Sequence, residues 1–285
     1  MACDTPHFVH PDGYVRAIPV PCGRCPPCKK RRVNEWIFRL QNEHLNCFSA
    51  YFVTLTYAPD HITVTQNGFM TLVKKDVQLF IKRLRKNETG SQKSPIKYYA
   101  VGEYGDTFRR PHYHLIIFNI RDFDSVFKAW TLGVVEVSQL NNPRIAYTLK
   151  YMNKDRRVPE HSSDDRVPEF SLMSKRLGSS YFENPDVIRY HKDDIYNRLN
   201  VVRPDGVILQ MPRYYRDNIF DEHEKRLQNE HISQLFAERE ASQREAYERR
   251  YSSDNRPVGD YDEHVERMKI HRYNKFYGNQ KLRDL

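Results

Sequence analysis

Two histidines separated by one residue give the sharpest chemical signal in the sequence. His112 and His114 lie in the segment Pro111–Phe118, and the apolar run that follows them is typical of a central β-strand. Residues two apart on a strand point to the same face, so the two imidazoles are expected side by side. Two such imidazoles can bind a divalent metal ion if a third ligand joins them. For an isolated pair, histidines packed beneath a helix would be the better interpretation.

Glu103 supplies the third candidate ligand. It ends a predicted strand over residues 96–103, and a short turn separates this strand from the one over residues 112–120. An antiparallel hairpin that turns near Thr107 brings residue 103 opposite residue 112, so the carboxylate faces both imidazoles. Two histidines and one glutamate suit Mn²⁺ or Mg²⁺ and leave positions for substrate oxygens.

A second signal is a pair of tyrosines on a predicted helix that begins at Pro143 and ends near Lys154. Tyr147 and Tyr151 are one turn apart on the same face, and Lys154 falls near that face. Tyrosine is a poor nucleophile because its pKa is about 10. To attack a phosphate it needs a metal ion that polarises the phosphoryl oxygen, and a nearby cation helps. Without a metal site, a helix that packs its rings would be the better interpretation.

Three cysteines, Cys22, Cys25 and Cys28, are spaced like ligands of a tetrahedral structural zinc site. The fourth ligand would be Cys3, Cys47 or a nearby histidine. An iron–sulfur cluster would need another cysteine shortly afterwards, where a basic run stands instead. Zinc binding and three reduced cysteines on a loop both remain open. Zinc is slightly favoured, because an irregular arm over residues 1–28 has little else to order it.

The composition favours a nucleic-acid partner. The 285 residues include 46 Lys and Arg against 37 Asp and Glu, a formal charge of +9, together with 19 Tyr and 15 Phe. Cations favour a polyanion, and aromatic rings can stack on the exposed bases of a single strand. No stretch approaches the roughly 20 apolar residues of a spanning helix, and the first residues lack a secretory signal. We therefore expect neither a membrane nor export, and the five cysteines fit a reducing cytoplasm.

The order of elements predicts an α+β fold with a central antiparallel sheet that bears the His-x-His strand and has helices packed on its faces. Besides the hairpin, strands are expected over residues 51–57 and 133–137, and helices over residues 29–46, 74–86 and 122–130. Residues 156–186 are expected to form an ordered loop or extension. Further along the chain, residues 201–212 predict a hairpin and residues 221–250 a long, charged helix.

In combination, these motifs resemble the HUH endonucleases, and in particular their rolling-circle replication initiators. The resemblance is carried by His112-Tyr113-His114, followed by Tyr147-x-x-x-Tyr151-x-x-Lys154, with Phe52–Tyr57 matching the first motif of those proteins. The C-G-x-C-x-x-C cluster before a basic helix, and residues 101–105, 110–114 and 169–174, are similar to initiators of gokushovirus-type microviruses, which are small single-stranded DNA phages. The resemblance runs from about Pro21 to about Tyr215. Tyr113 stands where the family usually has an aliphatic residue.

The resemblance implies a Rep-type fold and a metal-dependent cut of single-stranded origin DNA, with a tyrosine joined to the 5′ phosphate and a 3′ hydroxyl left as primer. It implies that Mg²⁺ or Mn²⁺ is bound by His112 and His114, with Glu103 as third ligand. Tyr147 and Tyr151 would be the nucleophiles, with Lys154 near the reacting phosphate. Conjugative relaxases have their tyrosines ahead of the histidines, whereas here they follow, as in initiators. Candidate DNA contacts are the basic residues Lys29, Lys30, Arg31, Arg32, Arg109, Arg110 and Lys150.

We therefore expect three regions: a Cys-rich N-terminal arm over residues 1–28, a nuclease domain with an extension over residues 29–215, and a charged helical region over residues 216–285. The expected partners are the single-stranded origin and host replication proteins, in the bacterial host's cytoplasm. The alternative is a non-catalytic, zinc-containing protein that binds single-stranded nucleic acid through the Cys cluster and the basic helix. Such a protein would need neither the His pair nor the tyrosine pair.

Overall fold

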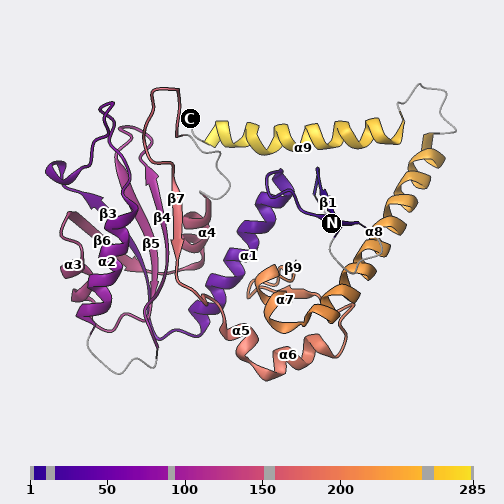
Figure 1. Cartoon of the computed structure of the whole chain (residues 1–285), viewed down its shortest axis with the longest axis horizontal. Helices are drawn as coiled ribbons and strands as arrows, with labels where there is room; N and C mark the ends of the chain where they lie inside the picture. Colours follow the sequence, from indigo (N-terminus) through magenta and orange to yellow (C-terminus); the bar gives the residue numbers. More distant parts are fainter. Residues whose placement is uncertain (1–2, 11–16, 89–93, 151–157, 252–259, 284–285) are drawn as a thin grey trace. The chain divides into compact units, whose positions relative to one another are not determined.

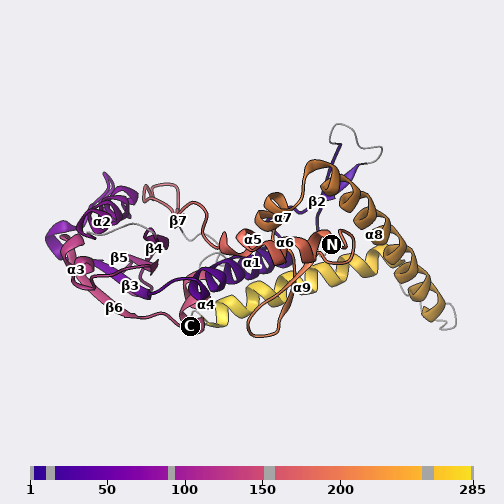
Figure 2. The ribbon, with the colours of Figure 1, turned by 90° about the horizontal axis from the view of Figure 1, so that it is seen from below.

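The computed structural model describes residues 3–10, 17–88, 94–150, 158–251 and 260–283, without the side chains of residues 279–283. Two compact units can be followed in Figures 1 and 2. The sheet unit is Trp36–Tyr181, and the terminal unit combines Met1–Glu35 with Phe182–Leu285. Among the described residues, no helix has the length and apolar character needed to cross a membrane. The expected division into arm, nuclease domain and C-terminal region stays a prediction.

The sheet unit is built around five antiparallel strands in the order β6-β3-β5-β4-β7. The strands are β3 (Ala50–Tyr57), β4 (Lys97–Tyr104), β5 (Pro111–Phe118), β6 (Gly133–Gln139) and β7 (Phe170–Met173). The His-x-His strand β5 is the middle one, as its apolar run predicts, and β4 and β5 form the expected hairpin. Glu103 pairs with His112 in the ladder, which is the predicted register. The predicted α+β fold is therefore confirmed.

One face of the sheet is closed by two helices, α2 (Lys74–Asn87) and α3 (Asp124–Ala129). The apolar residues of α2 recur at three- and four-residue intervals, so they form one stripe against the strands. Each such side chain contributes about 1.5–3 kcal/mol when it is fully buried. This stripe and the strand residues that it covers are all buried: Val77, Phe80, Ile81, Leu84, Val53, Leu55, Leu115 and Ile117.

The opposite face carries the candidate chemistry and is covered differently. Helix α4 (Asn142–Lys150) buries Ile145, Thr148 and Leu149 there. The later part of helix α1 (Pro26–Leu45) lies on the same side, where the rings of Trp36 and Tyr99 are 5.1 Å apart. This face is less completely covered at α4, whose outer side chains are exposed.

Residues 156–186 are more regular than expected. They contain the edge strand β7 and two short helices, α5 (Ser180–Glu183) and α6 (Pro185–Lys192). Strand β7 has only four residues and pairs only with β4, so its alternating pattern is too short to recognise in the sequence. Here the expectation of a loop is corrected.

The terminal unit is mostly helical. The hairpin β8 (Asn200–Val202) and β9 (Ile208–Gln210) and the long helix α8 (Glu222–Tyr251) are the elements predicted from the sequence. Two features were not expected: a small ladder between β1 (His7–Val9) and β2 (Ile18–Val20), and helix α9 (Tyr261–Arg283). The unit also contains α7 (Arg213–Ile219) and the beginning of α1.

Candidate metal centre and nucleophile

Three side chains of the central hairpin converge on one face of the sheet. Glu103 Oε1 lies 2.8 Å from His112 Nε2 and 2.8 Å from His114 Nε2. The three candidate ligand atoms all lie within 4.8 Å of one another. The ladder places Glu103 opposite His112, and His114 follows two residues along β5 on the same face. The structure thus brings together the three residues that the sequence indicated, and their role as metal ligands stays a prediction.

Each histidine has a partner behind its ring. His112 Nδ1 lies 3.1 Å from the backbone carbonyl oxygen of Arg110, which can only accept a hydrogen bond. The proton is therefore on Nδ1, and neutral His112 turns a lone pair on Nε2 toward Glu103. His114 Nδ1 lies 3.1 Å from the hydroxyl of Thr54 on β3. Metal-binding histidines are commonly oriented by such groups.

Thr54 was not singled out from the sequence, although the alternation of Tyr51–Tyr57 carried a signal for it. Thr54 pairs with His114 in the β3–β5 ladder. Directly paired residues on neighbouring strands lie on the same face of a sheet. A hydroxyl at this position could therefore have been expected beside the second histidine.

Glu103 is buried, with 2% of its surface exposed, and its Oε2 has no hydrogen-bond partner among the described residues. Leaving a buried carboxylate oxygen unsatisfied costs free energy that a cation would recover. Cis ligands about 2.1 Å from an octahedral Mg²⁺ lie about 3 Å apart, close to the spacing of these ligand atoms. The donor set therefore fits a small divalent cation.

The ionisation of the cluster points the same way. Burial by itself raises the pKa of Glu103, but the hydrogen bonds with His112 and His114 outweigh burial and hold the pKa below its usual value. Burial by itself lowers the pKa of His112, and Glu103 more than reverses this, so the pKa is raised. The cluster thus contains an ionised carboxylate that attracts positive charge, whether a proton or a metal ion.

Tyr147 on α4 lies against this cluster. Its ring centroid is 5.6 Å from that of His114 and 6.4 Å from that of Phe52, which stacks on His114 at 5.3 Å. The residue is 45% exposed, so a strand of DNA can reach it. Burial, followed by the charges of Glu103 and Asp106, raises the pKa of Tyr147. By itself this tyrosine is therefore a weak nucleophile, and a cation beside Glu103 would offset part of the effect.

The other two residues of the predicted tyrosine motif, Tyr151 and Lys154, lie outside the described residues. The described part of α4 ends at Lys150, which is exposed. The placement of Tyr151 one turn beyond Tyr147 stays a prediction.

Tyr113, between the two histidines, points to the other face of the sheet and is fully buried. Its hydroxyl accepts a hydrogen bond of 2.9 Å from Val73 N and lies 2.7 Å from the hydroxyl of Tyr57. Val73 is the N-cap residue of α2, where no side chain caps the helix. A tyrosine fits this position because its hydroxyl ties β5 to the beginning of α2.

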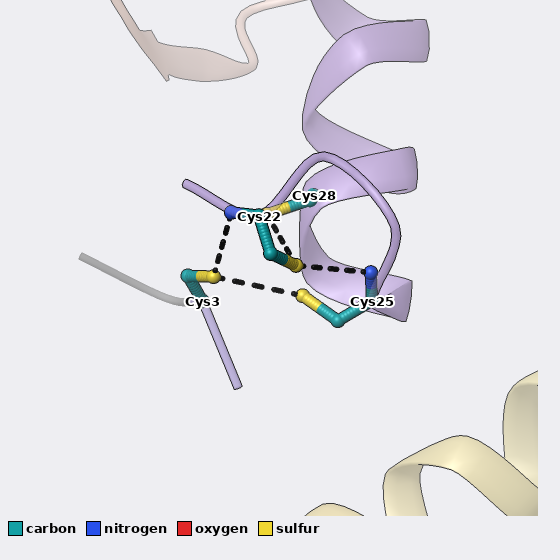
Figure 3. A group of neighbouring side chains, drawn as sticks. All are labelled: Cys3, Cys22, Cys25 and Cys28. Atoms are coloured by element: carbon teal, nitrogen blue, oxygen red, sulfur yellow. Dashed lines mark hydrogen bonds between the residues drawn. The ribbon is translucent and has the colours of Figure 1, made fainter. Parts of the chain in front are cut away.

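A second group of candidate metal ligands lies in the terminal unit (Figure 3). Cys22, Cys25 and Cys28 are joined there by Cys3, which was one of the alternatives for the fourth ligand. Cys47 is elsewhere: its thiol donates to the carbonyl oxygen of His44 at 3.2 Å.

The basic residues predicted to contact DNA fall into two groups. Lys30, Arg32 and Lys150 are exposed. The others have partners within the protein: Lys29 with Tyr277, Arg31 with Glu35, Arg109 with Glu160, and Arg110 with the carbonyl oxygen of Tyr57. Their predicted role in DNA binding is not tested by these contacts.

Comparison with known proteins identifies the family of the segment that contains the hairpin. Residues 50–156 match a family model for replication-associated proteins of the ORF2 type. This segment belongs to that family. It contains Glu103, His112, His114 and Tyr147, as well as the undescribed Tyr151 and Lys154, and it leaves out the Cys cluster.

Phage and virus proteins of similar name match a larger part of the chain. Replication-associated protein ORF2 of Spiroplasma virus 4 is 32% identical over 200 residues, which cover 64% of this chain and 62% of that protein. Replication-associated protein VP4 of Bdellovibrio phage phiMH2K is 29% identical over 219 residues, 69% of this chain and 66% of that protein. Replication-associated protein ORF4 of Chlamydia phage 1 is 26% identical over 234 residues, 72% of this chain and 56% of that protein.

These matches confirm the resemblance to phage replication proteins that the motifs indicated. The chain spans about three fifths of the length of the curated relatives it matches. No solved structure matches the chain significantly.

Proposed function

We propose that this protein is a replication initiator that cuts single-stranded origin DNA by metal-dependent attack of a tyrosine and later rejoins the strand. The observation that supports this most is the Glu103–His112–His114 cluster with Tyr147 packed against His114. All four residues fall in the segment that matches the family of replication-associated proteins. A purely structural role would not require an exposed tyrosine beside a buried carboxylate and two imidazoles.

The proposed reaction exchanges one phosphodiester for another. The tyrosine oxygen attacks the phosphorus atom, the bond from phosphorus to the 3′ oxygen breaks, and the tyrosine proton is given up as the 3′ hydroxyl forms. The 5′ phosphate is then joined to the tyrosine. Because the phosphotyrosine keeps the energy of the broken bond, a 3′ hydroxyl can reverse the step without ATP.

The protein's own part in this reaction is to hold ligands and present the nucleophile. Glu103, His112 and His114 form a rigid donor set, oriented by the Thr54 hydroxyl and the Arg110 carbonyl oxygen. A Mg²⁺ or Mn²⁺ ion bound there would polarise the phosphoryl oxygens. Lys154 would offset charge near the reacting phosphate, and Tyr151 would be a second nucleophile about one helical turn from Tyr147.

Partners and location follow from the same proposal. The free 3′ hydroxyl is a primer, so a polymerase must extend it, and the host's replication proteins would supply this activity. The protein would therefore work in the cytoplasm of a bacterial host, on the phage's single-stranded origin.

The test is a covalent adduct on a denaturing gel. Oligonucleotides that tile the phage strand are labelled at either end and incubated with the full chain and Mn²⁺ or Mg²⁺. We expect the 3′ label to migrate with the protein and the 5′ label to appear on a shorter free strand, which a polymerase can extend. EDTA should abolish both products, and added Mn²⁺ should restore them.

The matched control is the variant His112→Ala/His114→Ala. It should bind the oligonucleotide, because phosphate and stacking contacts lie outside the cluster, but it should form no adduct at any Mn²⁺ concentration. Binding by the wild-type chain without any adduct across the tiled genome would instead support a non-catalytic nucleic-acid-binding protein.

A further inference from the structure

Four cysteine thiols gather in the terminal unit, outside the segment that matches the family (Figure 3). Cys3 Sγ lies 3.9 Å from Cys25 Sγ, and Cys22 Sγ lies 4.0 Å from Cys28 Sγ. All four sulfur atoms lie within 4.8 Å of one another, and none forms a disulfide. Sulfur atoms at the corners of a tetrahedron, about 2.3 Å from a central zinc ion, lie about 3.8 Å apart. The observed spacing is therefore close to that of a four-cysteine zinc site.

Backbone N–H groups point at the same sulfur atoms. Arg24 N and Cys25 N lie 3.4 and 3.3 Å from Cys22 Sγ, so the loop between Cys22 and Cys25 wraps around one sulfur. Gly23 has a φ of +74°, a left-handed conformation that a side chain would disfavour. Donors directed at sulfur stabilise a thiolate, which is the form that binds a metal.

The arm contributes in the same way. Cys22 N donates to Cys3 Sγ at 3.3 Å, and Asp4 N donates to Cys25 Sγ at 3.4 Å. These two contacts join the arm to the loop reciprocally, although the residues are about twenty positions apart. Cys28 lies in the first turn of α1, where the helix dipole also favours a negatively charged sulfur.

We propose that Cys3, Cys22, Cys25 and Cys28 bind one zinc ion, which fixes the N-terminal arm to the beginning of α1. Four protein ligands close the coordination sphere, as in structural rather than catalytic zinc sites. A cluster of several irons with inorganic sulfide would need its thiolates farther apart to make room for its core, so the spacing favours a single ion. The negative charge of four thiolates around a divalent ion is offset by the nearby cations Arg24, Lys29 and Lys30.

The ion would also support helix α9 within the same unit. Lys29, next to Cys28, donates to the hydroxyl of Tyr277 at 2.8 Å. Asp4, next to Cys3, accepts a hydrogen bond from Arg272 Nε at 3.2 Å. Both anchors of α9 are thus adjacent in sequence to proposed zinc ligands, so loss of the ion should loosen this helix as well as the arm.

The first measurement is the metal content of the full chain purified without chelators. We use the His112→Ala/His114→Ala background, so that an ion at the sheet cluster is not counted. We expect about one zinc per chain and no iron. Cys3→Ser should lose most of the zinc, whereas Cys47→Ser, the matched control outside the cluster, should keep it. Absence of metal, iron in place of zinc, or equal zinc in both variants would overturn the proposal.

Cobalt gives a second measurement that does not depend on nuclease activity. Chain refolded with Co²⁺ should show the strong thiolate charge-transfer and visible bands of a tetrahedral four-sulfur site. Cys3→His, which can still coordinate, should keep stoichiometric binding with shifted bands, and this separates a lost ligand from a misfolded arm. Hydrogen exchange should show faster exchange in residues 3–9 and in α9 for Cys3→Ser but not for Cys47→Ser. Unshifted bands in Cys3→His would exclude Cys3 as a ligand.

Discussion

The two candidate metal sites of this chain differ in what holds their ligands in place. Glu103, His112 and His114 are fixed by the ladder between two inner strands of the sheet, so their spacing does not depend on an ion. The four cysteines come from a short arm, a loop and the first turn of a helix, linked by a small two-stranded ladder and a few N–H···S contacts. The first site is built before its ion binds, and the second needs its ion to be complete.

This difference assigns different uses to the binding energy of the two ions. A preformed set of three ligands can exchange its ion and keep open positions for a substrate. A closed set of four ligands on flexible segments converts the affinity for the ion into folding free energy. Removing metal should therefore cost activity at the sheet cluster and structure at the Cys cluster.

The largest effect is expected from removing the nucleophiles. Tyr147→Phe/Tyr151→Phe should form no covalent adduct at all, whereas either single variant should still form some. Each single variant should fail to sustain repeated cycles of cutting and joining, because the second tyrosine must attack while the first still holds the 5′ end. Denaturing gels and peptide mapping of wild-type adducts provide the measurement. If only one of the two tyrosines ever carries nucleotide, the alternating mechanism is wrong.

The next largest effect is expected at the ligands themselves. His112→Ala/His114→Ala should lower the rate of strand cleavage by roughly a thousandfold or more, since Lewis-acid stabilisation is worth several kcal/mol. Its melting temperature should stay near that of the wild type, because the strand ladder does not depend on the ion. A cooperative loss of sheet structure in this variant would remove the distinction between the two sites.

A smaller effect is expected from Thr54→Val, which removes the hydroxyl behind His114 but keeps the shape of the side chain. Loss of such an orienting group typically weakens metal binding by about 10- to 100-fold. Titration with Mn²⁺ measures the change. Thr56→Val is the matched control, because the Thr56 hydroxyl contacts only a backbone carbonyl oxygen, that of Val134, at 3.4 Å. Equal affinities in the two variants would show that Thr54 does not position His114.

The sequence predicts the hairpin and its register well because local rules determine both. Strand alternation fixes which residues share a face, and the length of the turn fixes that residue 103 opposes residue 112. The three members of the sheet cluster could therefore be named together. Thr54 was missed because it is brought to His114 by a strand some sixty residues away, and long-range pairing has no local signature.

The elements that the sequence did not predict share a weak or absent period. Strand β7 is an edge strand of four residues, and α9 has no continuous apolar stripe. The choice of Cys3 as the fourth member of its cluster also could not be made from spacing. It depends on the β1–β2 ladder, which folds the arm back toward the loop that contains Cys22.

The smallest effect concerns the residue between the two histidines. Tyr113→Phe removes a hydroxyl that accepts from Val73 N and contacts Tyr57, on the face opposite the metal cluster. The buried N–H of Val73 then has lost its acceptor, which costs about 1–3 kcal/mol of folding stability. Denaturant unfolding measures this cost. Affinity for Mn²⁺ and cleavage by the folded variant should be unchanged, because neither histidine contacts the lost hydroxyl. Tyr113→Leu, which carries the aliphatic type usual in HUH proteins, should be no more stable, since the hydroxyl is required here by the beginning of α2 rather than by the chemistry. If Tyr113→Phe weakened Mn²⁺ binding as much as Thr54→Val, the two faces of β5 would not be independent, and the preformed character of the sheet cluster would have to include the packing behind it.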